Sequence, residues 1–245
     1  MAQNEITILC TRNIDESLIK DAASKNIFVD VIPFIRIIPV STKEIKAEIK
    51  KALMLPAKIV FTSTNAVEIV AAETREQKPT WQIFCIGHAT RESAEKHFGK
   101  NSISGMADHA EALAKIIIEA HVDRLIFFCG DRRRKELPAI LKQNNIELRE
   151  VVVYQSIATP TRTEKHYKGI LFFSPSAVKS FFQRNDLDDQ TVLFALGNTT
   201  AREIKKSRTA GKKLLKNKII VSDEPEQKSL LEKAVNYFHT NPIHL

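Results

Sequence analysis

Short runs of apolar residues alternate with longer amphipathic stretches along the chain. The runs that predict strands lie at 6–10, 59–61, 83–86, 124–129, 148–154, 170–173, 192–196 and 218–221. The stretches that predict helices lie at 14–23, 66–72, 90–97, 110–120, 135–144, 177–184, 200–207 and 227–238. Because strands alternate with helices in βαβ units, the pattern predicts an α/β fold built on parallel sheets.

The two halves of the chain repeat each other. Residues 59–67, IVFTSTNAV, align with residues 170–178, ILFFSPSAV, at an offset of 111. Residues 84–90, FCIGHAT, align with residues 194–200, FALGNTT, at an offset of 110. Two weaker matches have similar offsets: 8–12 with 127–132, and 29–34 with 149–154. Repeats of this kind fix the architecture before any single motif is interpreted, and here they predict a duplicated α/β unit.

Two extended segments with prolines near their ends are the best candidates for connections between domains, at about 35–41 and 155–160. If the chain crosses at both, the second domain is continuous over 42–157. The first domain is then discontinuous and joins 1–38 to 160–245. Two crossings of this kind would flank one cleft.

The composition is that of a globular protein, since 43% of the 245 residues are hydrophobic and 27% are charged. The longest apolar runs fall far short of the roughly 20 residues that span a bilayer, and residues 1–10 lack the features of a signal peptide. We therefore expect a cytoplasmic protein without a membrane segment. Cys10, Cys85 and Cys129 lie in apolar strand-like runs, which is typical of buried, reduced thiols.

The net charge of +8 favours acidic partners, and a nucleic acid or a polycarboxylate would both fit it. Trp81 and the three tyrosines form no recognisable stacking array, so we expect no nucleic acid partner. The 7 glycines include no GxG or GxxxxG spacing, which argues against dinucleotide and nucleoside triphosphate sites. HExxH and zinc-type cysteine pairs are absent, so we expect no metal, and the absence of GxSxG leaves nucleophilic catalysis without support.

Hydroxyl side chains and glycines follow several of the predicted strands, just where the next helix begins. Such residues cap free backbone N–H groups, and the same turns can bind anions at the carboxyl ends of parallel strands. Both interpretations are open from these residues alone. The residues concerned are Thr62, Ser63, Gly87, Thr90, Ser174, Ser176, Gly197, Thr199 and Thr200.

A basic run, Arg132-Arg133-Arg134-Lys135, follows the strand at 124–129 through Gly130. Cations at the start of a helix oppose the helix dipole, so Arg132 and Arg133 are candidates for holding a ligand, with solvated surface charge as the alternative. Tyr154 ends an apolar strand just before a linker candidate. Its phenol can hydrogen-bond an anion, or it can be a packed tyrosine at a hinge.

Taken together, these motifs resemble the uroporphyrinogen-III synthase family over nearly the whole chain. The resemblance is carried by Phe61-Thr62-Ser63, Ile86-Gly87 with Ala89-Thr90, Phe128-Cys129-Gly130 with Arg134, Val153-Tyr154-Gln155, 172–178, and Leu196-Gly197 with Thr199-Thr200-Ala201. It implies two flavodoxin-like α/β domains joined by a two-stranded linker, with the substrate held between them. It also implies a cofactor-free reaction, cyclisation of hydroxymethylbilane to uroporphyrinogen III with loss of water and inversion of the last pyrrole ring.

By the same resemblance Tyr154 is the catalytic candidate, which assists departure of the terminal hydroxyl by donating a hydrogen bond. The hydroxyl residues of the strand-end turns are expected to face the cleft and hold acetate or propionate groups: Thr62, Ser63, Thr90, Ser174, Ser176, Thr199 and Thr200. The family resemblance suggests a monomer, and the preceding enzyme of the pathway is a candidate partner.

The chain departs from the family pattern at one turn before the last helix. Many relatives place a hydroxyl residue after the proline there, whereas here Pro225 is followed by Glu226, which puts carboxylate binding at that turn in doubt. A second hypothesis from another class is a non-catalytic two-domain module that binds or senses an anionic small molecule in the same cleft.

Overall fold

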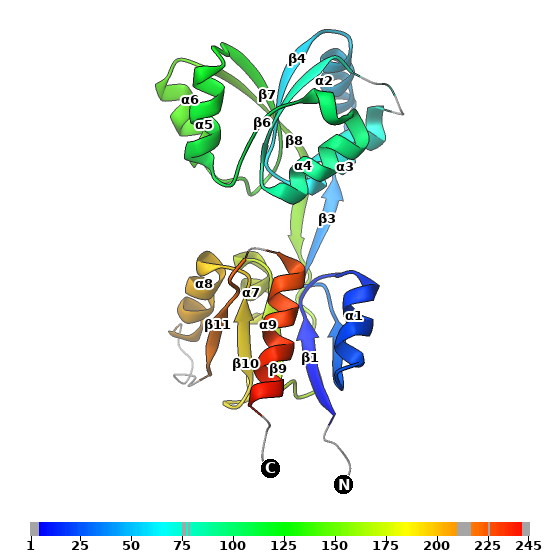
Figure 1. The fold of residues 1–245 in the computed structure, drawn as a ribbon, viewed down its shortest axis with the longest axis vertical. Helices are drawn as coiled ribbons and strands as arrows, with labels where there is room; N and C mark the ends of the chain where they lie inside the picture. The colour runs from blue at the N-terminus through cyan, green and yellow to red at the C-terminus, as the bar shows by residue number, and fades with distance from the viewer. Residues whose placement is uncertain (1–4, 75–76, 78, 210–216, 225, 242–245) are drawn as a thin grey trace. The chain divides into compact units, whose positions relative to one another are not determined.

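The structure, a computed structural model, describes residues 5–74, 77, 79–209, 217–224 and 226–241 (Figure 1). The chain divides into two compact units. Unit 1 comprises Met1–Arg36 and Ile157–Leu245, and unit 2 comprises Ile37–Ser156. Unit 1 is therefore assembled from two separate segments, whereas unit 2 is one continuous segment.

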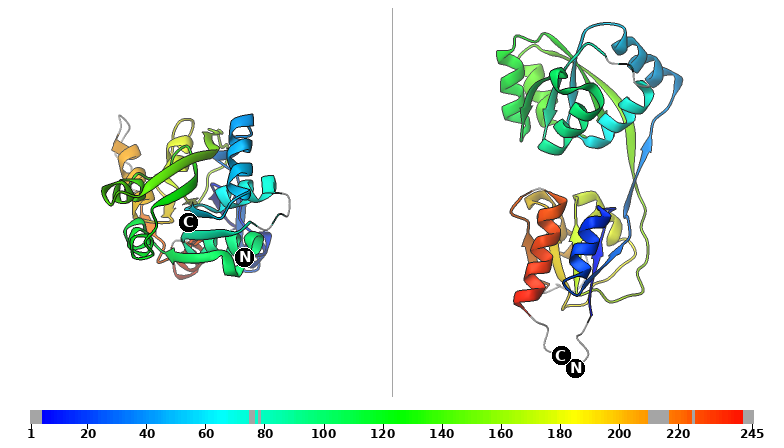
Figure 2. Two further views of the ribbon diagram at one scale, coloured as in Figure 1. Left: turned by 90° about the horizontal axis from the view of Figure 1, so that it is seen from above. Right: turned by 45° about the vertical axis from the view of Figure 1, so that its right-hand side comes forward.

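The sheet of unit 1 is parallel between all of its neighbouring strands. Its described strands, in spatial order, are β11 (Ile219–Val221), β10 (Val192–Ala195), β9 (Gly169–Phe172), β1 (Ile6–Cys10) and β2 (Ile27–Val31). Apolar residues of α1 (Glu16–Ala23) and α9 (Gln227–Thr240) cover one face of this sheet. Those of α7 (Pro175–Phe181) and α8 (Asn198–Thr209) cover the other. Figure 2 shows α1 and α9 side by side within the unit.

The sheet of unit 2 has the same parallel pairing among five of its strands. Its described strands, in spatial order, are β3 (Ile35–Pro39), β8 (Glu147–Ala158), β7 (Arg124–Gly130), β4 (Ala57–Phe61), β5 (Trp81–Ile86) and β6 (Ile103–Ala107). One face is covered by α2 (Lys43–Leu53), α3 (Thr64–Thr74) and α4 (His88–Phe98). The other is covered by α5 (Ala110–Glu119) and α6 (Glu136–Gln143), and a short 3-10 helix, η1 (Lys100–Ser102), precedes β6.

The two sheets share one strand order, because β2-β1-β9-β10-β11 in unit 1 corresponds to β8-β7-β4-β5-β6 in unit 2. The stronger repeat segments coincide with this correspondence: β4 and α3 match β9 and α7, and β5 and α4 match β10 and α8. The weaker matches place β1 against β7 and β2 against β8. The predicted α/β class with parallel sheets is therefore confirmed, and the sequence repeat corresponds to a repeated structure.

Some element boundaries differ from the prediction. The strand predicted at 148–154 continues to Ala158 as β8, because its backbone hydrogen-bonds to β3 beyond the end of the apolar run. The Val40 N–H donates to the Val153 carbonyl at 2.8 Å, and the Thr159 N–H donates to the Phe34 carbonyl at 3.0 Å. The residue numbers rise on one side and fall on the other, so this pairing is antiparallel.

Ser180 carries a buried hydroxyl in the core of unit 1. It lies on α7, its side chain is fully buried, and its Oγ has no hydrogen-bond partner among the residues that the structure describes. We expect Ser180→Ala to raise the free energy of unfolding by about 1 kcal/mol, because a buried polar group without a partner is removed and alanine favours the helix. Urea unfolding followed by circular dichroism measures this change, and a loss of stability would contradict it.

Candidate active site

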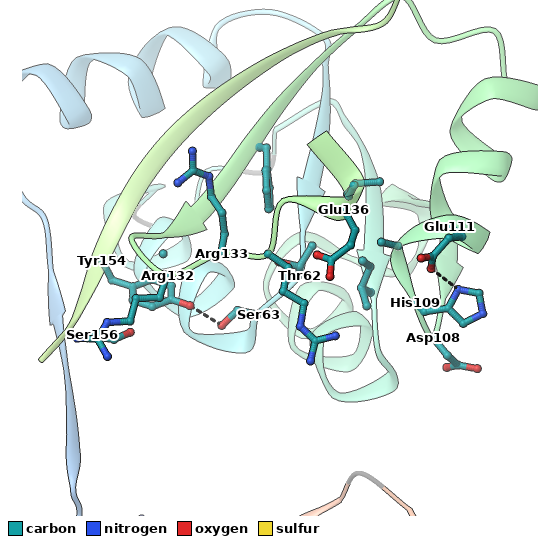
Figure 3. A pocket seen from close by; sticks show the side chains of 16 residues that line it. Thr62, Ser63, Asp108, His109, Glu111, Arg132, Arg133, Glu136, Tyr154 and Ser156 are labelled. Carbon is teal, nitrogen blue, oxygen red and sulfur yellow. Dashed lines mark hydrogen bonds and ion pairs between the residues drawn. The ribbon is translucent and has the colours of Figure 1, made fainter. Parts of the chain in front are cut away.

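A pocket of about 430 Å³ opens at the carboxyl ends of the strands of unit 2 (Figure 3). This is the end of a parallel α/β sheet at which ligands normally bind. Thr62 and Ser63 follow β4, Gly130 and the arginines follow or end β7, and Tyr154 and Ser156 lie on β8. The pocket therefore brings together the predicted residues Thr62, Ser63, Gly130, Arg132 and Tyr154.

Ser63 is held in a fixed position by the backbone at the start of α3. β4 lies between β7 and β5 in the middle of the sheet and ends at the buried Phe61, so the next two residues emerge at the mouth of the pocket. The Ser63 Oγ accepts a hydrogen bond from the Asn65 N–H at 3.2 Å. This bond is the capping role that the sequence allowed for this hydroxyl, and it coexists with a position in the pocket wall.

A bulge in the sheet aims Tyr154 at this hydroxyl. Cys129 of β7 is opposite Val152 of β8, yet Gly130 is opposite Tyr154, so Val153 is an extra residue on β8. Simple alternation would put Tyr154 on the opposite face from Val153, whereas both pack against the same core cluster. The Tyr154 hydroxyl donates a hydrogen bond to the Ser63 Oγ at 3.1 Å, drawn in Figure 3.

Gly130 leaves the space that the Tyr154 ring occupies. A Cβ atom on Gly130 would lie 2.5 Å from the Tyr154 Cε2 and 2.8 Å from its hydroxyl oxygen, too close for any side chain. The loop beyond Gly130 is tied to β8 as well, since the Asp131 N–H donates to the Tyr154 carbonyl at 3.1 Å. The Asp131 Oδ1 accepts the Ser156 N–H at 2.9 Å. Gly130 is thus required by packing, in addition to its place at the strand end.

The three arginines of the pocket wall differ in their partners. Arg133 forms an ion pair with Glu150 of β8, and in Figure 3 its side chain extends away from Tyr154 and Ser63. Among the described residues, Arg132 and Arg134 have no ion-pair partner, and both are exposed. Arg132 lies beside Tyr154 and Ser156 in Figure 3. Arg132 and Arg134 are therefore the guanidinium groups available to an anionic ligand.

The pocket also has an acidic side, which the sequence analysis did not identify. Asp108, His109 and Glu111 come from the turn between β6 and α5, and Glu136 begins α6. The His109 Nδ1 accepts the Ala112 N–H at 3.3 Å and lies 3.2 Å from the Glu111 Oε2. In Figure 3 Asp108, His109 and Glu111 lie on the opposite side of the pocket from Tyr154 and Arg132, and Glu136 lies between the two sides. A prediction of β6 from the sequence would have placed the turn that follows it at the same end of the sheet as Thr62 and Ser63.

Two predicted residues of unit 2 do not line this pocket. Gly87 follows β5 with a φ of 86°, a backbone conformation that favours glycine, and precedes α4. Thr90 lies in the first turn of that helix and is only 6% exposed. Ile86, directly before Gly87, does line the pocket. The turn is therefore adjacent to the pocket, but the Thr90 hydroxyl has little exposed surface to offer a ligand.

The remaining predicted residues lie at the equivalent strand ends of unit 1. Ser174 follows β9 and accepts the Ala177 N–H at 3.2 Å as the cap of α7, and Ser176 is half-buried in the same helix. Gly197 follows β10 and precedes α8, where Thr199 is exposed and Thr200 is 3% exposed. These five residues gather at one end of the unit 1 sheet.

Unit 1 has two charged groups at the same sheet end. Arg12 follows β1, as Arg132 follows β7 in the repeat, and its guanidinium lies 5.7 Å from the centroid of the Phe173 ring. Glu226 is the first residue before α9, and its side chain makes no capping hydrogen bond. Its charge therefore remains at a helix N-terminus, the position an anion would otherwise occupy. Pro225 lies outside the described residues.

The cysteines are unsuited to nucleophilic chemistry. All three are free and buried, as expected from the sequence. Burial raises the pKa of Cys129, next to Gly130, to about 11, so its thiol stays protonated near pH 7.

Within the described ranges, no group of three or more acidic, histidine or cysteine side chains is placed to hold a metal ion. No helix in the part of the chain that the structure describes is long and apolar enough to cross a membrane.

The fold and pocket define a two-unit α/β enzyme with its site at the carboxyl ends of parallel strands. Residues 17–232 match the family model for uroporphyrinogen-III synthase HemD, so the chain belongs to the uroporphyrinogen-III synthase family. It is an enzyme of tetrapyrrole biosynthesis, and the reaction of the family is the cyclisation of hydroxymethylbilane. The fold and function expected from the sequence resemblance are thereby confirmed.

Solved structures of the same fold are similar over nearly the full chain. Uroporphyrinogen-III synthetase from Helicobacter pylori has a TM-score of 0.65 and 15% identity, covering 95% of this chain and 99% of that chain. A mutant uroporphyrinogen III synthase from Thermus thermophilus has a TM-score of 0.63 and 12% identity, covering 96% of this chain and 99% of that chain. At this identity the likeness concerns the fold.

Proposed function

We propose that the pocket of unit 2 holds the reacting end of hydroxymethylbilane, and that units 1 and 2 are the two domains of the enzyme. The observation that carries this assignment is the hydrogen-bonded hydroxyl pair of Tyr154 and Ser63. The same pocket contains two arginines that have no ion-pair partner in the described part of the chain. Hydroxyl donors suit the leaving hydroxyl of the substrate, and guanidinium groups suit its carboxylates. The turns of unit 1 with Ser174, Ser176, Gly197, Thr199 and Thr200 hold further carboxylates.

Tyr154 assists the first step, which is the loss of the terminal hydroxyl. The bond between the terminal carbon and oxygen breaks, and both electrons leave with the oxygen. The neighbouring pyrrole nitrogen supplies electrons to the carbon and gives up its proton, so water departs. Hydrogen bonds to the leaving oxygen stabilise the charge that develops on it. The substituted carbon of the last ring then attacks the electron-poor terminal carbon and forms a spiro intermediate. The bond from that ring carbon to the neighbouring methylene bridge breaks, and the bridge rejoins the ring at its free carbon, which gives up its proton, so the ring is inverted.

Positioning is the larger task, because the linear substrate also closes without the enzyme to give the uninverted isomer. Purified protein is mixed with freshly prepared hydroxymethylbilane, and the oxidised uroporphyrin isomers are separated by chromatography. We expect isomer III to dominate at a rate well above the blank. Isomer I alone, at the blank rate and from folded protein, would contradict the proposal and favour a binding or sensing module.

Arg132→Ala is expected to raise KM for hydroxymethylbilane about 3–10-fold with little change in kcat, because an exposed charge-assisted contact to a carboxylate is lost from ground state and transition state alike. Arg124→Ala is the matched control. Arg124 begins β7, the strand that Arg132 follows, so it lies at the end of the strand away from the pocket. Its Nε is 2.8 Å from the Glu147 Oε2. Steady-state kinetics in low salt measure the difference, and equal KM values for both variants would argue against an Arg132 contact.

We further propose a monomeric, cytoplasmic enzyme. An intermediate that cyclises by itself reaches this enzyme intact only if its transfer is fast, which supports the preceding enzyme of the pathway as a partner. Sedimentation of the purified chain, alone and with that enzyme, tests the oligomeric state and the association.

A further inference from the structure

The hydrogen bonds around Ser63 leave its hydroxyl with one unused capacity. A serine hydroxyl has one proton to donate and two lone pairs that accept. The Ser63 Oγ accepts from the Asn65 N–H at 3.2 Å and from the Tyr154 hydroxyl at 3.1 Å, which fills both lone pairs. Among the described residues its own proton has no acceptor. Ser63 is therefore a donor only, and it lines the pocket.

The hydroxyl proton of Tyr154 is already used in this arrangement. A phenol is a much stronger acid than an aliphatic alcohol, so in a Tyr–Ser pair the phenol is the better donor and the serine the better acceptor. The backbone N–H of Asn65 can only donate, so it uses one lone pair of the Ser63 Oγ and cannot accept the Ser63 proton. Tyr154 can then donate to a substrate only if it first breaks its bond to Ser63.

We propose that Ser63, rather than Tyr154, donates the hydrogen bond to the departing hydroxyl of the substrate, and that Tyr154 is a positioning residue that acts through Ser63. This proposal rests on the function proposed above and names the group in direct contact. Two donors to one hydroxyl oxygen polarise its O–H bond, which strengthens the bond that the hydroxyl donates in turn. Ser63 contributes a hydrogen bond only, so the proton balance of water loss is unchanged.

The positions of the Tyr154 ring and the Asn65 N–H fix the orientation of the Ser63 hydroxyl. The Tyr154 ring packs where a side chain on Gly130 would otherwise lie, and the bulge at Val153 keeps it there. The Asn65 N–H belongs to the first turn of α3 and moves only with that helix. Ser63 is thus held by hydrogen bonds from a residue of the sheet and from a residue of the helix. A hydroxyl held in this way can stabilise a developing charge without rearranging.

A double-mutant cycle separates the two roles. We expect Ser63→Ala to lower kcat by about 100-fold with KM changed less than threefold, because one donor to the developing oxyanion is lost. Tyr154→Phe should lower kcat only about 3–10-fold, because Ser63 keeps its proton and loses one polarising bond. The double variant should be no slower than Ser63→Ala alone. A Tyr154→Phe enzyme slower than Ser63→Ala, or two effects that multiply, would overturn the proposal.

Two further variants distinguish the hydroxyl from the fold. Ser63→Thr keeps the hydroxyl and should retain at least a third of kcat, whereas a loss as large as that of Ser63→Ala counts against the proposal. Thr42→Ala removes a similar cap in the same unit, where the Thr42 Oγ1 accepts the Ile45 N–H at 3.3 Å before α2. Thr42→Ala should lower the free energy of unfolding by about 1 kcal/mol, as loss of the cap in Ser63→Ala should. It should leave kcat unchanged.

The outcomes separate this inference from the proposed function. If the wild-type chain yields only isomer I at the blank rate, the proposed function fails. If the wild-type chain yields isomer III and the cycle is additive, the function stands and the role given to Ser63 is wrong. If Ser63→Ala raises KM and leaves kcat unchanged, Ser63 binds a carboxylate in the ground state, which also overturns the proposal.

Discussion

Gly130→Val is expected to lower kcat by about 10-fold while unit 2 stays folded. Valine suits a strand, but its Cβ would occupy the position that the Tyr154 ring fills, 2.8 Å from the hydroxyl oxygen. The ring must move by about an ångström or more, and its bond to Ser63 is lost. Gly130→Val therefore removes the same polarising bond as Tyr154→Phe, and it should cost about as much in rate. Rapid mixing with hydroxymethylbilane and isomer analysis measure this loss.

The control for Gly130→Val is the same substitution in a Tyr154→Ala background. Without the ring the valine has room, so it should add little to the effect of Tyr154→Ala alone. Unchanged kcat in Gly130→Val would mean that the position of the Tyr154 ring has no bearing on turnover.

Phe61→Ala is expected to lower the free energy of unfolding of unit 2 by about 3–5 kcal/mol, because a fully buried aromatic ring is removed and a cavity remains. The Phe61 ring stacks on Phe98 and Phe128, with centroids 6.0 and 5.8 Å away. It lies at the end of the central strand β4, directly before Thr62 and Ser63. The same cavity therefore loosens the pocket, and activity should be lost at temperatures at which the variant is still folded.

Trp81 provides the measurement for Phe61→Ala. It is the single tryptophan of the chain, lies in unit 2, and its ring is 5.1 Å from that of Phe98. Its fluorescence in urea therefore follows the unfolding of unit 2 without a signal from unit 1. Phe61→Leu, which leaves a smaller cavity, should cost about 1–2 kcal/mol. Equal midpoints for wild type and Phe61→Ala would refute the central role of this ring in the core.

The strand-end turns were predictable because the sequence repeats them. The segments before Ser63 and Ser174 are apolar enough to be buried on both faces, and buried parallel strands produce such continuous apolar runs. By contrast, β6 contains Ser104 and Gly105 and lies at an edge, so its apolar signal is broken. Helix α2 is rich in lysine, although Ile45, Ile49 and Ala52 show the spacing of a buried helix face.

The geometry of the pocket was less accessible from sequence. Asp108 and His109 follow the unpredicted β6, and Ser156 lies on the part of β8 beyond its apolar run. The bulge that turns Tyr154 toward Ser63 involves pairing between two strands, which local patterns do not reveal. The choice among the arginines also depends on a distant residue, because Glu150 pairs with Arg133.

The assembly of unit 1 from two separate segments sets an order on folding during synthesis. β1 is hydrogen-bonded to both β2 and β9, so one of its partners is about 160 residues further along the chain. At translation rates of 5–20 residues per second, β1 waits on the order of ten to thirty seconds for β9. Unit 2 is complete on the ribosome before then. During this interval the edge of β1 that later pairs with β9 is exposed, and an unpaired strand edge of this kind is a template for pairing with other chains.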